Sequence, residues 1–406
     1  MKEYILLFPI FMLQACSTQN REETIKQIET NPNVKIINID NGFYKENISF
    51  TDYYNPPKTI LLETADNCLI QEVQSLEIYE NNIYILDSRA NRLFVFNMEG
   101  HFLYQIGSPG AGPGEYLQIS DFTIDRESQI IYVFDEFASK VHKYNLQTSQ
   151  YQSSINIRKI GNQTFYLQYT EGMLYLNETA INGKEPKHLL RMLNSQTGEQ
   201  EGLFLDSKLY NKGWNLTLRN YHNFFYGKGT KSPKYIEWFM DTIVAVKGRK
   251  IYPSYIVRSR DFATENDIKR LIDTYYSNGR SYNFESIASD GKIYHIDNFV
   301  ESDTFVYFRF EKSNTSHHLF YDKQNQTVRL TENFTDDYFA KGFSMNQNFC
   351  YYDKSGAYSV IQTDMLPLVK VHVIDSDFLN PQIDNYDKIK NIKEDSNPII
   401  LYYPFK

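Results

Sequence analysis

The sequence predicts an all-β protein, a six-bladed β-propeller whose blades are four-stranded antiparallel sheets. Tyr and Phe are abundant, with 33 and 28 copies among 406 residues, and aromatic side chains favour strands. Short strand-like segments separated by turn residues recur from residue 73 onward. The pattern Ile-Tyr-x-x-Asp occurs at Ile83 and returns 48 residues later at Ile131, a spacing typical of propeller blades.

Each repeated unit contains four strands joined by short turns. In the first two units the expected strands cover residues 73–79, 83–87, 93–96 and 102–106, and then 119–124, 131–135, 141–144 and 152–157. A single four-stranded twisted sheet cannot bury both of its faces, so such units stack on one another. Stacking around an axis closes a ring and leaves only short, protected edges. We therefore expect one continuous propeller over residues 33–406.

A glycine-rich loop connects the first unit to the second. Its glycines permit positive φ, whereas Pro113 fixes its own φ and excludes a helix. A phosphate-binding loop would need Gly-Lys-Ser or Gly-Lys-Thr at the start of a helix, but Gly114 is followed by Glu115 and a strand. We expect a structural loop in which Glu115 accepts backbone N–H bonds at the blade junction. The residues assigned to this blade-junction loop are Gly107, Gly110, Gly112, Pro113, Gly114 and Glu115.

One helix is expected as an insertion after the fourth unit, near residues 264–278. Thr264 and Asp267 form a capping-box pattern, and Ile268 and Leu271 fall on one helical face. Such an apolar stripe favours packing against a blade edge over binding a partner helix.

The last unit lacks one strand. It supplies segments at residues 349–352, 358–361 and 399–403, while the N-terminal segment 34–39 has no partner in the repeat. Pairing the two ends of the chain would remove both open sheet edges at once. We expect residues 34–39 to complete the last blade, so that it is closed by N- and C-terminal strands.

The N-terminus carries an export signal. Lys2 precedes an apolar run at residues 5–13, which is too short to span a bilayer but has the length of a signal-peptide core. The run ends in Leu-Gln-Ala-Cys, which resembles a bacterial lipobox with Cys16 as the acylated residue. We predict a lipoprotein signal peptide at residues 1–15, a flexible tether at residues 16–32 and a membrane anchor through a lipid on Cys16. An ordinary signal peptide with an incidental cysteine is the alternative.

Five stretches together carry a family resemblance. They are Leu-Leu-Glu-Thr at 61–64, the strand-rich run 83–107, Gly-Ala-Gly-Pro-Gly-Glu-Tyr at 110–116, Asp-Thr-Ile-Val-Ala-Val at 241–246 with Tyr-Pro at 252–253, and Asn-Pro-Ile-Ile-Leu-Tyr at 397–402. With these stretches the chain resembles a family of six-bladed β-propeller lipoproteins common in gut-associated Gram-negative bacteria, related in architecture to NHL-repeat propellers. The resemblance implies the fold, export and lipidation, with an outer-membrane lipoprotein facing the periplasm or the cell surface. It assigns no catalytic residues.

Net charge bears on the choice of partner. The formal charge is −8 and no long basic run occurs, whereas nucleic-acid binding requires a basic surface that neutralises phosphates. We therefore expect no nucleic-acid partner, and we expect a monomer without a cofactor.

The eight histidines are scattered along the chain. A propeller lyase or hydrolase would gather metal ligands on the inner strands around the central channel. Only His295 and, with weaker support, His222 are expected on inner strands, and two histidines are too few for a zinc site without carboxylates. Cys68 and Cys350 lack metal-ligand spacing and are expected to be unpaired thiols.

Two aromatic residues, Trp214 and Tyr221, are candidates for a binding rim, where flat rings stack on sugars or anchor a protein. The function that fits is a lipid-anchored envelope β-propeller that acts as a non-catalytic binding or scaffolding module for a glycan or protein ligand. The alternative is a metal-assisted lyase or hydrolase with its site at the central channel. It would need three or more His, Asp or Glu side chains that converge at one channel mouth.

Overall fold

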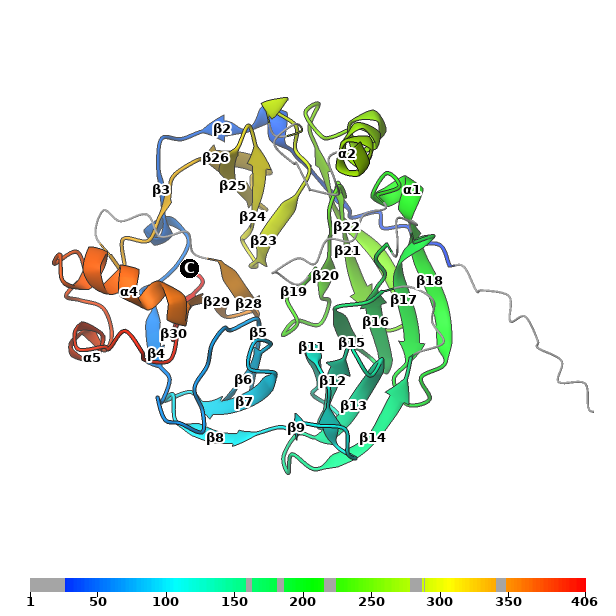
Figure 1. The fold of residues 1–406 in the computed structure, drawn as a ribbon. Helices are drawn as coiled ribbons and strands as arrows, with labels where there is room; N and C mark the ends of the chain where they lie inside the picture. Colours follow the sequence, from blue (N-terminus) through cyan, green and yellow to red (C-terminus); the bar gives the residue numbers. More distant parts are fainter. Residues whose placement is uncertain are drawn as a thin grey trace, which may run out of the picture.

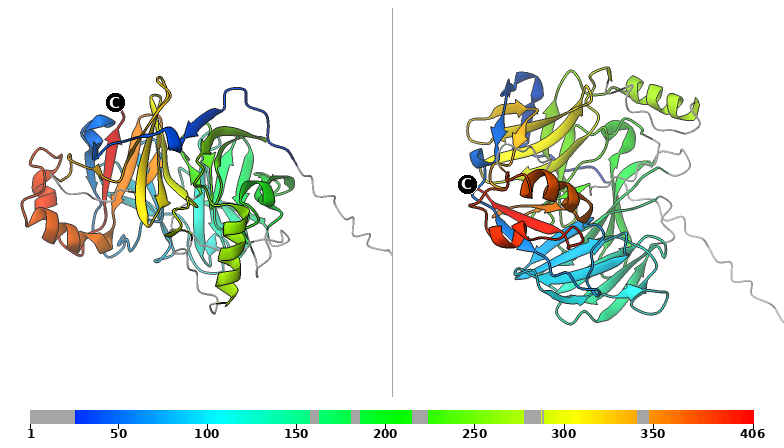
Figure 2. Two further views of the ribbon diagram at one scale, coloured as in Figure 1. Left: turned by 90° about the horizontal axis from the view of Figure 1, so that it is seen from above. Right: turned by 60° about the vertical axis from the view of Figure 1, so that its left-hand side comes forward.

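The computed structural model describes residues 26–157, 163–180, 186–214, 224–277, 287, 289–340 and 348–406. Six sheets of four or five strands surround a central axis, which confirms the predicted six-bladed β-propeller (Figure 1). Within each blade, strands that follow one another in the sequence pair antiparallel from the axis outward. Seen from the side, the blades form a disc from which helix α2 projects (Figure 2).

Blades one to three follow the predicted repeat closely. Blade one contains β5 (Ser75–Tyr79), β6 (Asn82–Asp87), β7 (Arg92–Asn97) and β8 (Phe102–Gln105); blade two contains β11 (Ile119–Asp125), β12 (Ile130–Asp135), β13 (Lys140–Asn145) and β14 (Tyr151–Asn156); blade three contains β15 (Leu167–Thr170), β16 (Met173–Asn177), β17 (His188–Asn194) and β18 (Gln200–Asp206). Apolar side chains such as Tyr84 and Val95 of blade one pack with Val133 of blade two and are almost fully buried. The repeated apolar strands are therefore the surfaces by which blades stack.

Blades four to six include strands from the N-terminal segment. Blade four contains β19 (Phe225–Tyr226), β20 (Lys234–Tyr235), β21 (Thr242–Lys247), β22 (Lys250–Arg258) and β1 (Lys35–Asn38); blade five contains β23 (Ile296–Glu301), β24 (Phe305–Lys312), β25 (Thr315–Asp322), β26 (Thr327–Thr331) and β2 (Phe43–Tyr44); blade six contains β28 (Phe349–Tyr352), β29 (Gly356–Ile361), β30 (Ile399–Pro404) and β4 (Lys58–Leu61). A further short pair joins β3 (Ile48–Ser49) to β27 (Phe334–Thr335).

The two ends of the chain close blade six, but the strand that does so is not the predicted one. The outermost strand is β4, which pairs antiparallel with β30 and places Ile60 opposite Ile400. The segment 34–39 instead contributes β1, which pairs parallel with β22 in blade four. Strand β22 is nine residues long and would otherwise present an open edge, so covering it satisfies backbone groups that a free edge leaves unpaired.

Residues 35–61 therefore form an N-terminal strap, in which β1, β2 and β4 are the outermost strands of blades four, five and six in turn, while β3 pairs with β27 in a separate short sheet (Figure 1). The segment just before the strap, which falls within the predicted tether, also contacts the propeller. The backbone N–H of Lys26 donates to the carbonyl of Leu203 at 2.9 Å, and that of Glu29 donates to the carbonyl of Ile251 at 2.8 Å.

The predicted helix is present as α2 (Glu265–Ser277). Its start is capped reciprocally, because the Thr264 N–H donates to Asp267 Oδ2 at 2.8 Å and the Asp267 N–H donates to Thr264 Oγ1 at 3.3 Å. Ile268 and Leu271 are buried against the body of the propeller, as the apolar stripe predicts.

The remaining helices are short. Within the described residues they are η1 (Ile39–Asn41) and η2 (Phe50–Asp52) in the N-terminal strap, α1 (Ser207–Tyr210) after blade three, and η3 (Thr363–Met365), α4 (Leu366–Val369), η4 (Lys370–Ile374) and α5 (Tyr386–Lys390) between β29 and β30. None of the helices in the described ranges is both long enough and apolar enough to span a bilayer.

Candidate functional site

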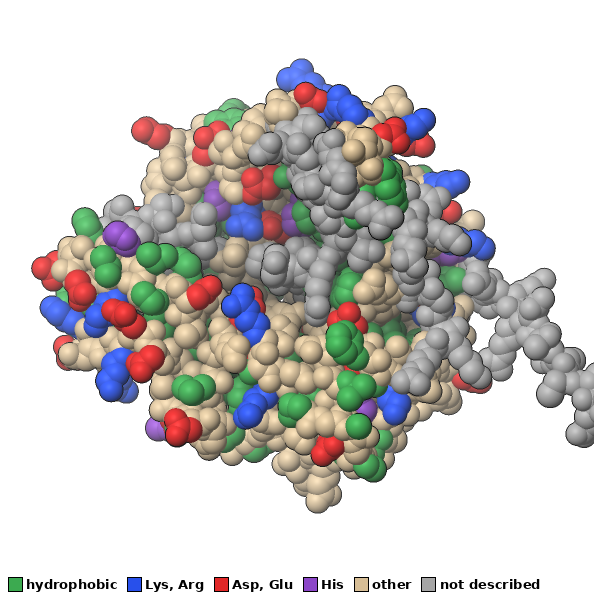
Figure 3. All heavy atoms as spheres, viewed as in Figure 1, with side chains coloured by type: hydrophobic (Ala, Val, Ile, Leu, Met, Phe, Trp, Pro, Cys, Tyr) green, Lys and Arg blue, Asp and Glu red, His purple; other side chains and the backbone are tan. Residues whose placement is uncertain are grey.

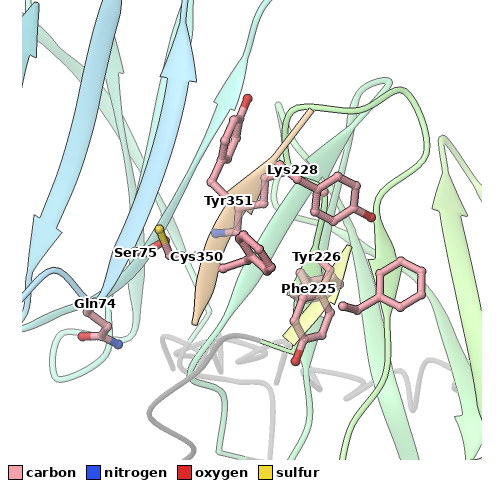
Figure 4. Close-up of a pocket in the computed structure, with 11 residues that line it drawn as sticks. Gln74, Ser75, Phe225, Tyr226, Lys228, Cys350 and Tyr351 are labelled. Carbon is pink, nitrogen blue, oxygen red and sulfur yellow. The ribbon is translucent and has the colours of Figure 1, made fainter. Parts of the chain in front are cut away.

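The inner strands of four blades line a narrow recess at the central axis, which we call the axial recess (Figure 4). Its free interior is about 40 Å³, which leaves room for only a few water molecules. Aromatic rings supply much of the wall. The lining residues are Gln74, Ser75, Phe225, Tyr226, Gly227, Lys228, Phe299, Phe349, Cys350, Tyr351 and Tyr352.

A cluster of four charged side chains, three of them buried and that of Arg126 partly exposed, lies beside the axial recess and spans three blades. Lys228, which follows β19 in blade four, places its Nζ 2.7 Å from Asp121 Oδ1 on β11 of blade two. Arg126, which follows β11, pairs its Nη2 with Glu77 Oε2 on β5 of blade one at 3.2 Å. The Arg126 Nη1 also donates to the carbonyl of Lys228 at 3.2 Å. The two cations and two carboxylates balance, so this axial charge cluster joins the blades across the channel.

Glu77 is fully buried within this cluster. Burial raises the pKa of its carboxyl, although the positive charges of Arg126 and Lys228 act in the opposite direction. Its second oxygen, Oε1, has no hydrogen-bond partner among the residues that the structure describes. The axial charge cluster is therefore held together at the cost of one unsatisfied carboxylate oxygen.

His295 lies directly before β23, the innermost strand of blade five. Its ring stacks on Trp238, with 4.0 Å between the ring centroids, and its Nδ1 is 3.9 Å from Asp297 Oδ2. Asp297 in turn is held by Arg309, whose Nε and Nη2 donate to its two carboxylate oxygens at 2.9 and 2.6 Å. Across the described ranges, no three His, Cys, Asp or Glu side chains come together as a metal site. His222 and Tyr221 lie outside the described residues.

Trp214 lies in the interior rather than on a rim. Only 5% of its surface is exposed, and its ring centroid is 4.9 Å from that of Phe239 in the apolar cluster beneath α2. Sequence composition cannot distinguish an exposed aromatic ring from a buried one, because the same residue types fill strand cores.

Glu237, which the sequence analysis did not select, shares a small recess with Trp214 and Trp238. Its carboxylate accepts hydrogen bonds from the Tyr235 hydroxyl at 2.7 Å and the Asn211 amide at 3.1 Å. Burial raises the pKa of Glu237 to about 8. The signal that could have identified it is a single carboxylate inside the apolar run Tyr-Ile-Glu-Trp-Phe-Met at 235–240.

The blade-junction loop connects β8 of blade one to β11 of blade two. Gly107 has φ +60° and Gly114 has φ +78°, and a Cβ at Gly114 would lie 2.8 Å from Tyr151 Cβ. Gly112 donates its N–H to Glu115 Oε2 at 2.8 Å. The loop therefore folds back on itself and rests directly on blade two, which only glycine permits at position 114.

The loop also borders a larger cavity, which we call the loop cavity, of about 460 Å³. Its other walls come from blade two, where His142, Tyr151 and Ser154 line it. These three residues look like ordinary strand residues in the sequence. Nothing in the local pattern indicates that a loop some 30 residues earlier covers them.

The fold defines the class of protein as a six-bladed β-propeller. Residues 34–404 match the family DUF4934, a domain of unknown function, and because this match covers most of the chain the protein belongs to that family. The NHL-like lipoprotein resemblance stays a prediction. A search of curated proteins found no match.

A solved structure shows the same fold. The chain is similar to a protein of Bacteroides fragilis NCTC 9343 that is provisionally described as exported, with 19% identity and a TM-score of 0.66 over 92% of this chain and 100% of that chain. It also matches a DUF4221 member from Bacteroides vulgatus ATCC 8482, with 11% identity and a TM-score of 0.49 over 87% of this chain and 97% of that one. At 19% identity the likeness to the Bacteroides fragilis protein shows the fold alone.

Proposed function

We propose that the protein is a lipid-anchored β-propeller of the bacterial envelope that acts as a non-catalytic binding or scaffolding module for a glycan or protein ligand. The observation that supports a binding role is how the channel charges are used. Lys228, Asp121, Arg126, Glu77 and the Arg309–Asp297 pair all have partners within the protein. Because these charges pair with one another and hold the blades together, we infer that the loops and cavities of the propeller faces recognise the ligand.

The surface of the face in Figure 3 suits a soluble recognition module. On the described part of this face, acidic and basic side chains are interspersed, and hydrophobic side chains form small groups between them. Mixed charge of this kind keeps a protein soluble while leaving local sites for specific contacts.

The binding role is tested by presenting residues 17–406, purified as a soluble chain, to a glycan array and to solubilised envelope proteins. Specific retention of a glycan or a protein, competed by the free ligand, is the expected result. Absence of any retained ligand on both would contradict the proposal.

The anchor is tested by expressing the full chain in a Gram-negative host with an alkyne fatty acid. We expect label on the wild type and none on Cys16→Ala. Label on both chains, or on neither, would contradict lipidation at Cys16.

A further inference from the structure

The loop cavity has the size of a small-molecule site. Its volume of about 460 Å³ falls within the range of about 300–1,000 Å³ that is typical of ligand pockets. One wall is backbone of the blade-junction loop, residues 110–115, and the opposite wall is made by strands β13 and β14 with the turn before β13. The walls come from segments held by the blade sheet and by the glycine packing at position 114, so the cavity is preformed.

The floor of the loop cavity carries a buried histidine, one of whose ring nitrogens makes only a long contact. His142 is 4% exposed, and its Nδ1 lies 3.0 Å from Ser154 Oγ, which in turn lies 2.7 Å from the Tyr151 hydroxyl. The other ring nitrogen, Nε2, lies 3.5 Å from Asp135 Oδ2, which is long for a hydrogen bond, and makes no shorter polar contact among the described residues. A buried polar atom that lacks a short hydrogen bond is stabilised when a ligand supplies a hydroxyl to it.

The carboxylates of the loop cavity are already occupied. Asp135 accepts the backbone N–H groups of Leu117 at 2.7 Å and Ala138 at 2.9 Å, and Glu115 accepts that of Gly112 at 2.8 Å. Lys140 adds one positive charge to the lining. Two carboxylates against one lysine leave the lining with a net negative charge, and both carboxylates are already bonded, so the cavity favours a neutral ligand over an anionic one.

Exposed apolar side chains lie in or next to the lining of the loop cavity. Tyr151 is 37% exposed and Leu117 is 46% exposed, and both line the loop cavity. Phe137, which directly precedes the lining residue Ala138, is 68% exposed. An exposed flat ring beside a hydroxyl-bonding floor is the combination that recognises a sugar, whose C–H face packs on the ring while its hydroxyls bond the polar groups.

We propose that the loop cavity binds a neutral saccharide, with a pyranose ring against Tyr151 and its hydroxyls bonded to His142 Nε2 and Ser154 Oγ. This inference rests on the proposed binding function and names the site and the chemical class of the ligand.

The test uses saturation-transfer NMR on residues 17–406 with maltotriose, cellotriose, xylotriose and mannotriose as neutral probes and trigalacturonic acid as the anionic probe. We expect transfer to at least one neutral probe and a weaker signal from the anionic one. Tyr151→Ala and His142→Gln should each lower the affinity by about tenfold or more, the effect of losing roughly 1.4 kcal/mol of contact. Tyr276→Ala removes a tyrosine of α2 that is 48% exposed and should leave binding unchanged.

The thermal unfolding midpoint of each variant shows whether it is still folded. The His142→Gln side chain keeps an amide that can form a hydrogen bond with Ser154. Absence of transfer to every neutral probe would overturn the inference, as would unchanged affinity in Tyr151→Ala and His142→Gln. If the array identifies a ligand whose binding ignores both substitutions, the loop cavity is the wrong site but the binding function stands. If no ligand of any kind is retained, both proposals fail.

Discussion

At the scale of single residues, several carboxylates lie buried inside a core that is rich in aromatic side chains. Glu237 is the clearest case, because its oxygens face Tyr235 and Asn211 and no cation pairs with it in the contacts described above. Desolvation disfavours the charged form, which is why burial raises the pKa of this carboxyl to about 8. Glu237 is therefore protonated at neutral pH in the folded protein and ionised in the unfolded chain.

This difference makes stability depend on pH. The folded state holds a proton that the unfolded state loses above the ordinary pKa of 4.5, so the contribution of Glu237 falls as pH rises from about 4.5 to about 8. Glu237→Gln lacks this titration and serves as the reference. We expect the free energy of unfolding of the wild type, relative to that of Glu237→Gln, to fall by up to about 5 kcal/mol between pH 4.5 and pH 8. Urea unfolding of both chains across this range measures it. Parallel pH profiles for the two would contradict the raised pKa.

At the scale of elements, ion pairs fasten neighbouring blades to one another. Glu301, at the end of β23 in blade five, lies 2.9 Å from Lys234 Nζ on β20 of blade four and 2.9 Å from Lys323 Nζ in its own blade. The Tyr255 hydroxyl of β22 also donates to it. Burial alone would raise the pKa of Glu301, but the two lysines and the tyrosine lower it to about 2. The carboxylate is thus a charged link between blades four and five.

Glu301→Gln leaves two lysines facing a neutral amide. We expect a loss of about 3 kcal/mol in the free energy of unfolding at neutral pH, because removing one partner leaves the other charges uncompensated. The contribution is present above the ordinary pKa of 4.5 and is lost as pH falls through about 2. Guanidinium unfolding of this variant and of Glu99→Gln, an exposed turn residue, provides the comparison. Equal stability of the two variants would show that the link contributes nothing.

The element scale also shows what local sequence pattern can and cannot predict. Asp87 and Asp135 recur at equivalent strand ends, and each accepts backbone N–H groups from nearby residues, a role that aspartate side chains commonly take at turns. The same reasoning located α2 from its cap and stripe. It placed the wrong strand in blade six, because residues 34–39 and 58–61 are both short apolar segments, and the path of the chain decides which sheet edge each one meets. The loop cavity was missed for a similar reason, since it arises where a loop meets strands that follow it.

At the scale of the whole molecule, closure of the ring depends on residues that are far apart in the sequence, because β4 of the N-terminal strap pairs with β30 near the C-terminus. Strand β4 is the outermost strand of blade six, and Ile60 on it is 5% exposed in the apolar cluster that also contains Ile400. Ile36 on β1 belongs to the same strap but is 46% exposed. The two isoleucines therefore form a matched pair that separates ring closure from general changes in the strap.

We expect Ile60→Asp to destabilise the protein by several kcal/mol, since it buries an unpaired charge at the seam, while Ile36→Asp changes stability by about 0.5 kcal/mol or less. The two tryptophans, Trp214 and Trp238, lie outside blade six, so their fluorescence reports on parts of the propeller remote from the substitution. If the ring unfolds as one unit, Ile60→Asp lowers the midpoint seen by fluorescence and by far-UV circular dichroism equally. A fluorescence midpoint that stays at the wild-type value would mean that blade six opens alone and that closure does not stabilise the ring.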